Sequence, residues 1–136
     1  VEGVDDLLAL LSGLDEDVRG DVVQDGLLAG ADVVARDIAA RAPRGATGEL
    51  AASIFAEKRD VEEGESVAVG IKGAWYWHFP EFGVVPHELG RKRDYAFHPG
   101  MPATPFIRPA VDENVERVLS EVGDAIRGAL EARAAR

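Results

Sequence analysis

Cysteine is missing from this chain of 136 residues. Its absence excludes disulfide bonds, thiolate catalysis and zinc sites with cysteine ligands, and it is typical of proteins made in a reducing cytoplasm. Long apolar runs are missing too, since none approaches the roughly 20 residues that span a bilayer. No signal-like segment opens the sequence. We therefore expect a soluble protein with no membrane partner.

Basic residues are scarce. The chain has 15 Lys and Arg against 25 Asp and Glu, and residues 1–40 alone contain ten carboxylates and only two arginines. An acidic surface repels phosphate backbones, so a protein that captures nucleic acid is disfavoured. The one dense basic run is Arg91, Lys92 and Arg93. It falls in a predicted loop, where it is either a solvated turn or part of a subunit contact.

Apolar residues recur with helical spacing in three segments. Residues 4–14 predict a short helix, residues 15–42 a long one that Pro43 ends, and a third helix runs from Pro109 to the final alanines. The long helix would measure about 40 Å, so we expect it to bend near Gly26 or Gly30 or to project beyond the core. The apolar stripe of the last helix is Val111, Val115, Val118, Val122, Ile126 and Leu130.

Two short segments between these helices have β-strand character. Residues 53–59 and 66–71 are β-branched or alternating, and an acidic stretch that contains glycine separates them. They predict a hairpin. The order helix, helix, hairpin, loop, helix predicts an α+β fold in which a small antiparallel sheet packs against long N-terminal and C-terminal helices. We expect one domain over residues 1–136.

The segment AWYWHFPEFG, residues 74–83, contains five aromatic rings. A platform for stacking nucleic-acid bases interleaves rings with Lys and Arg, whereas the charged residues here are acidic. The rings therefore either fill the core or anchor a protein interface. We expect Tyr76, Phe79 and Phe82 to pack internally. The candidates for contact with a neighbouring subunit are Trp75, Trp77, His78, Arg91, Lys92 and Arg93.

Histidines and glutamates in the middle of the chain raise the alternative of a metal-dependent enzyme. His78, His87 and His98 are nine and eleven residues apart, unlike the four-residue spacing of helical metal motifs. No serine or threonine lies in a recognised nucleophile motif. We therefore assign no catalytic residue, no metal ligand and no cofactor, and we expect a protein that is not an enzyme.

Three patches together resemble one protein family. They are RAPRGATGELAASI at 41–54, WYWHFPEFG at 75–83 and PATPFIRPAVDE at 102–113. They are similar to motifs of the tail-component family of tailed bacteriophages typified by gene product ten of phage HK ninety-seven, which also occurs in prophages and gene transfer agents. The positions that match are Pro43, Thr47, Gly48, Leu50, Ser53 and Ile54, then Tyr76, Glu81, Phe82 and Gly83, then Pro105, Phe106, Arg108, Pro109 and Ala110.

The resemblance implies a structural virion protein without enzymatic activity. It implies a homo-oligomeric ring, hexameric or dodecameric, at the neck between the head and the tail. Its partners would be connector or stopper proteins on one side and tail-terminator or tail-tube proteins on the other, and genome DNA would pass without specific binding. The protein would be made in the bacterial cytoplasm. A small cytoplasmic homo-oligomeric interaction module remains the alternative.

Two features depart from the family pattern. Pro80 falls where the family often has a short helix, so that helix would start later, turn or vanish. Residues 84–104 form a loop insertion that we expect to protrude as a loop or hairpin, with a possible strand at 95–97. We also expect Arg108 and Glu81 to form an ion pair that ties the last loop to the aromatic segment.

Overall fold

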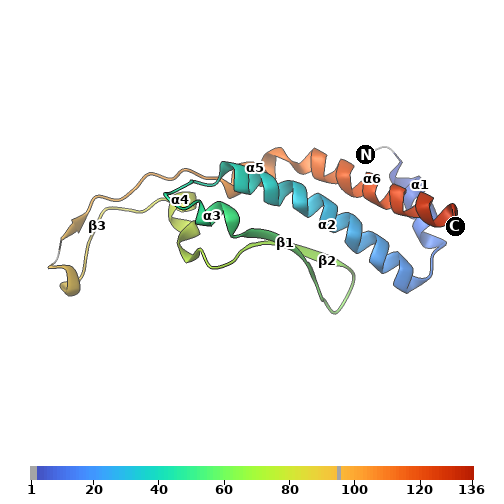
Figure 1. Ribbon diagram of the computed structural model, residues 1–136, viewed down its shortest axis with the longest axis horizontal. Helices are drawn as coiled ribbons and strands as arrows, with labels where there is room; N and C mark the ends of the chain where they lie inside the picture. The colour runs from blue at the N-terminus through green and yellow to red at the C-terminus, as the bar shows by residue number, and fades with distance from the viewer. Residues whose placement is uncertain (1–2, 95) are drawn as a thin grey trace.

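The computed structural model describes residues 3–94 and 96–136. It shows an elongated α+β molecule in which two long helices lie above a hairpin, and a thin arm projects from one end (Figure 1). The predicted fold class is confirmed. In chain order the elements are α1 Val4–Ser12, α2 Glu16–Arg41, α3 Glu49–Ala52, β1 Ile54–Arg59, β2 Ser66–Ile71, η1 Trp75–Trp77, α4 His78–Phe82, β3 His87–Glu88, η2 Arg91–Arg93, β4 Phe97–His98, α5 Ile107–Glu113 and α6 Val115–Ala134.

Helices α2 and α6 lie side by side in opposite directions and form the body (Figure 1). Two glycines of α2 set the contact: a Cβ added at Gly26 would lie 2.7 Å from Cγ1 of Ile126, and one at Gly30 would lie 2.6 Å from Cγ2 of Val122. α2 runs unbroken through both glycines. They therefore allow close helix packing, a role that the sequence analysis did not assign to them. Among the described helices, none is long and apolar enough to cross a membrane.

The core has two parts, one at each end of the body. Near the arm, the end of α2 meets α3, the aromatic segment and α5. At the other end, Leu7 and Leu11 of α1 and Leu14, which follows α1, pack against the contact between α2 and α6. The buried residues of the first part are Ile38, Ala42, Leu50, Ala74, Phe106 and Ala110, and those of the second are Val22, Ile126 and Leu130.

The predicted hairpin is present and antiparallel. Its register pairs Ile54 with Ile71 at one end and Arg59 with Ser66 at the other. It packs against α2. The side chain of Gln24 on α2 reaches the turn end of the hairpin, where the Nε2 group donates to the Ser66 carbonyl oxygen at 3.3 Å. The hairpin thus adds one small layer beneath the helix pair.

The last helix is divided, which corrects the prediction of one helix from Pro109 onward. α5 ends at Glu113 and α6 begins at Val115, with Asn114 between them at φ −105 and ψ 5. Because the chain turns there, Val111 and Val115 do not join the buried stripe and are 45% and 51% exposed.

Candidate functional site

Residues 84–104 leave the body as two antiparallel stretches and form a projecting arm (Figure 1). Near the body, Val84 and Met101 exchange two backbone hydrogen bonds of 2.8 Å each. Farther out, β3 pairs with β4, and η2 closes the tip. The expected protrusion is therefore a narrow hairpin. Of the strand expected at 95–97, Phe97 belongs to β4 and Ala96 does not, and Tyr95 lies outside the described residues.

Two glycines shape the base of the arm. Gly83 has φ 75, and a Cβ there would lie 2.9 Å from the Ala103 nitrogen. Gly100 has φ 79, and a Cβ there would lie 2.5 Å from the Val84 carbonyl oxygen. Residues with a side chain rarely adopt such φ values, and neither position has room for a Cβ atom. The base therefore requires glycine at both positions.

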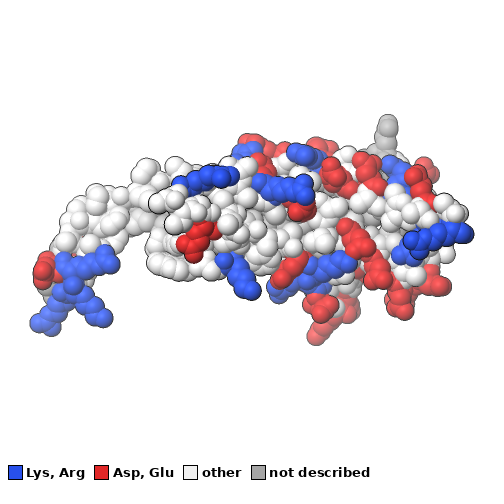
Figure 2. Space-filling model, viewed as in Figure 1, with Lys and Arg blue, Asp and Glu red and all other residues white. Residues whose placement is uncertain are grey.

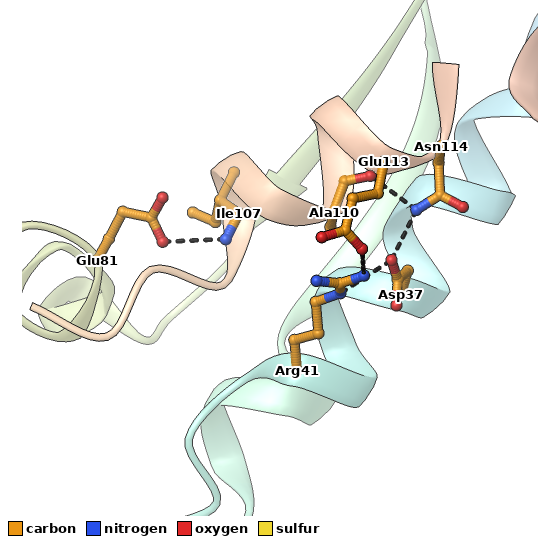
Figure 3. A network of polar contacts seen from close by, with 7 residues as sticks. All are labelled: Asp37, Arg41, Glu81, Ile107, Ala110, Glu113 and Asn114. Carbon is orange, nitrogen blue, oxygen red and sulfur yellow. Dashed lines mark hydrogen bonds and ion pairs between the residues drawn. The ribbon is translucent and has the colours of Figure 1, made fainter. Parts of the chain in front are cut away.

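Glu81 connects the base of the arm to α5. Its carboxylate is buried and accepts three backbone N–H groups, from Phe106 at 2.8 Å, Ile107 at 2.9 Å and Arg108 at 3.0 Å (Figure 3 draws the second). The first N–H groups of a helix have no partner within the helix, so a carboxylate there satisfies them and also favours the helix dipole. The prediction of an ion pair with Arg108 is wrong. Glu81 accepts the backbone N–H of Arg108 and does not bind its guanidinium group.

The bonds to Glu81 also fix its charge. Burial raises the pKa of this carboxyl, but the three backbone N–H groups, together with the positive charge of Arg108, outweigh burial and hold the pKa below its ordinary value. Hydrogen bonds from donors favour the ionised form. Glu81 is therefore ionised at neutral pH and connects α4 to the start of α5.

Some aromatic rings of residues 74–83 face solvent, and others pack against the core. Ala74 and Pro80 are buried, and Tyr76 packs against the first core as expected. Trp75 is 71% exposed and meets the partly exposed ring of Phe79 edge to face, with centroids 5.8 Å apart. Phe82 is 73% exposed. The rings thus form an exposed aromatic patch beside the arm.

Two predictions about these rings need correction. Phe82 and Phe79 were expected inside, yet both are exposed. Trp77 is partly buried against the first core, and its contact with a neighbouring subunit stays a prediction. The segment is helical in η1 and α4, so residues separated by three or four positions lie on the same face. α4 forms despite Pro80, which lies in its first turn, where no N–H is needed.

The arm carries exposed apolar side chains and is basic at its tip. Val85 is 77% exposed and Phe97 66% exposed. The tip, η2, carries the three basic residues Arg91–Arg93, all exposed, and stands out as the basic end of the molecule in Figure 2. Large exposed apolar side chains on a projecting element are typical of a contact with another protein.

The histidines do not converge on a metal site. The rings of His87 and His98 stack across the arm with centroids 5.1 Å apart, while His78 lies on α4. The oxygens of Glu81 are taken by the α5 backbone. In residues 3–94 and 96–136, no three His, Asp or Glu side chains are grouped so that they could hold a metal ion.

A second polar cluster ties α2 to the break between α5 and α6 (Figure 3). Asn114 donates to Asp37 at 2.6 Å and to the Ala110 carbonyl oxygen at 2.7 Å. Arg41 binds Asp37 at 3.0 Å and also pairs with Glu113. The hydrogen bond from Arg41 is the main reason that the pKa of Asp37 is lowered. Arg41 thus joins the carboxylates of Asp37 and Glu113, which indicates a structural role for this cluster.

Sequence reasoning missed this polar cluster. Asp37 and Arg41 are one helical turn apart on α2, which is a visible signal of a local ion pair. Their partners Glu113 and Asn114 lie more than seventy positions away, with separations of 72 and 77 residues. No spacing within the sequence connects such distant positions.

The first motif patch forms the passage from α2 to the hairpin. Pro43 follows the end of α2. Gly48 has φ 63 and precedes α3, and the Thr47 hydroxyl accepts the Glu49 N–H at 3.4 Å. Leu50 is buried in the first core. This patch therefore contributes the turn and a core anchor.

The second and third patches meet at one place, the contact of Glu81 with the start of α5. Phe106 is 1% exposed and fills the first core beside this contact. Pro105 is exposed just before it, and Pro109 lies in the first turn of α5. The motif residues thus fix the base of the arm, while the exposed rings and the tip lie around it.

Comparison with models of protein families gives a match. A family model described as "Bacteriophage HK97-gp10, putative tail-component" matches residues 5–83, more than half of the chain. The matched range includes the patches at 41–54 and 75–83 and ends where the arm begins. No curated protein and no solved structure matches the chain.

Proposed function

The chain belongs to the HK97-gp10-like family of bacteriophage tail components, and we propose that it joins the DNA-filled head to the tail as a ring of identical copies at the neck. In this role it is a structural part of the virion without catalytic activity. Its neighbours are a connector or stopper protein on the head side and a tail-terminator or tail-tube protein on the tail side.

The observation that carries the proposal is the presence of unlike exposed apolar surfaces on one chain. The arm and the aromatic patch lie at one end, and an uncovered apolar stripe lies on α5 and α6, formed by Val111, Val115 and Leu119. A contact between two different surfaces of identical subunits is heterologous, and heterologous contacts close into rings when the rotation permits. A hexamer or a dodecamer would satisfy such closure.

The acidic excess suits a DNA channel. The chain carries a formal net charge of −10, and carboxylates crowd its first forty residues. A channel wall of this sign repels the DNA backbone, so the genome passes without binding. This part of the proposal requires that a share of those carboxylates face the inside of the ring.

Deletion of the gene from the parent phage or prophage tests the proposal. Electron microscopy of the lysate should show filled heads beside separate, unjoined tails, and expression of the wild-type chain in trans should restore joined particles. Joined, infectious particles in the deletion lysate would overturn the role at the neck. Heads joined to tails of abnormal length would instead place the chain in tail assembly.

A further inference from the structure

We propose that the arm of one copy docks on the α5–α6 stripe of the next copy, with Phe97 against Val115 and the basic tip against carboxylates of α6. This contact rests on the proposed ring, and it specifies which surfaces the neighbouring subunits use. The arm is defined as residues 84–104 and the stripe as Val111, Val115 and Leu119.

The arm has the form of an element that needs a partner. It points away from the body of its own chain (Figure 1), so its apolar side chains Val85 and Phe97 lie in solvent. Its base is fixed by Gly83, Gly100 and the Glu81 contact, so its direction is set before any partner binds. A pre-set element loses less entropy on binding than a flexible loop does.

The stripe has the form of an acceptor. The apolar face of α6 is covered by α2 and α1 from Val122 to Leu130, but its continuation at Val115 and Leu119 is uncovered. Leu119 also lines a hollow between α1 and α6, together with Leu7 and Gly123. An apolar surface of this kind favours an apolar occupant.

Charge selects a second copy as that occupant. The arm holds three basic residues and two acids, whereas the whole chain has a net charge of −10, so the arm is positive and the rest strongly negative. Glu116 and Asp124 also line this hollow, and Asp124 pairs with Arg127, a third lining residue, at 3.3 Å. A basic tip therefore finds opposite charge on the body of another copy.

The direction of the arm sets which groups meet. Arg93 lies beyond Phe97 on the arm, where the Ala96 N–H donates to the Arg93 carbonyl oxygen at 3.0 Å. With Phe97 over Val115 and the arm running toward the C-terminal end of α6, the basic tip faces the carboxylates of α6, and Val85, nearer the base, lies toward Val111.

Engineered disulfides in assembled phage particles test the contact. The chain has no cysteine, so the wild type gives no background. We expect the pairs F97C/V115C and V85C/V111C, in oxidised particles, to give a ladder of species larger than dimers on non-reducing gels. Each copy then both donates an arm and accepts one. Reduction should return the ladder to monomer. The second pair provides an independent test if the first variant fails to fold or to assemble.

Matched controls separate this contact from its alternatives. In F97C/V61C the second cysteine replaces an exposed valine of the hairpin turn, so little ladder is expected. Monomers only from both test pairs, or equal ladders from the control pair, would overturn the arm contact. Dimers from F97C alone would show that arms pair with each other, which also overturns it. Absence of the chain from particles would overturn the proposed function first, and the contact with it.

Discussion

At the scale of single residues, Glu81 explains why two separate sequence patches belong together. Its carboxylate receives the N–H groups of Phe106, Ile107 and Arg108, so the aromatic segment and α5 meet at one buried charge. The sequence indicated that Glu81 and Arg108 are connected, but it could not show how. Residue types identify opposite charges, whereas a bond to the backbone depends on where the helix begins.

Replacement of Glu81 by Gln should destabilise the protein. The amide keeps one acceptor oxygen but loses the charge and turns an NH2 group toward donors, so we expect a loss of about 2 kcal/mol in the free energy of unfolding. Chemical denaturation at pH 7 measures it. Glu88→Gln, an exposed change on the arm, is the matched control and should stay within about 0.5 kcal/mol of the wild type. Equal stability of both variants would contradict the structural role of Glu81.

The lowered pKa of Glu81 gives this loss a pH dependence. A carboxyl whose pKa is lower in the folded than in the unfolded state contributes stability that is fully present above the unfolded value, here 4.5. That contribution is lost as pH falls through the folded pKa. The difference in stability between the wild type and Glu81→Gln should therefore be constant near neutral pH and shrink in acid below the unfolded value. Denaturation curves at a series of pH values measure it, and a difference that grows in acid would contradict this assignment.

At the scale of elements, the helices and the hairpin follow from the sequence because their patterns are local. The periodicity of α2 and the alternation of the strands could be seen without tertiary information. The contact face of α2 could not, because Gly26 and Gly30 add nothing to an apolar stripe. The break at Asn114 was missed for another reason: its side chain binds Asp37, which lies 77 positions away.

The glycine contact predicts opposite effects for one substitution at two helical sites. Alanine at Gly30 would place its Cβ 2.6 Å from Val122 and 3.0 Å from Val118, so we expect a loss of about 1–3 kcal/mol from overpacking. Gly128 on α6 has nothing within 4 Å of the added atom. There, alanine should stabilise by up to about 1 kcal/mol through its higher helix propensity. Thermal denaturation measures both changes, and stabilisation at both positions would contradict close packing at Gly30.

At the scale of the whole molecule, the sequence predicted a protrusion at 84–104 but not the surfaces around it. The arm has its own short-range pairing, while its direction depends on the left-handed glycines and on Glu81 at the base. Which rings face outward was equally hidden. Trp75 and Phe82 are exposed and Trp77 is partly buried against the first core because η1 and α4 rotate the segment. A run of consecutive aromatic residues does not reveal its own rotation.

The uneven charge of the molecule leads to a prediction about assembly. Reversal of the tip, R91E/K92E/R93E, should leave the melting temperature unchanged because these side chains are exposed, yet it should strongly reduce incorporation of the chain into particles. Repulsion would replace attraction between the arm and the acidic body of the neighbouring copy.

The matched control is R44E/R133E/R136E, which changes the net charge equally at exposed positions away from the arm. Immunoblots of purified particles, with the soluble chain measured in the same lysates, compare the two variants. If the control is lost from particles as completely as the tip variant, total charge rather than the tip governs assembly. If only the tip variant is lost, addition of E116R and D124R to it should restore incorporation, because the attraction returns with both signs exchanged. Failure of that rescue would move the partner of the tip away from α6.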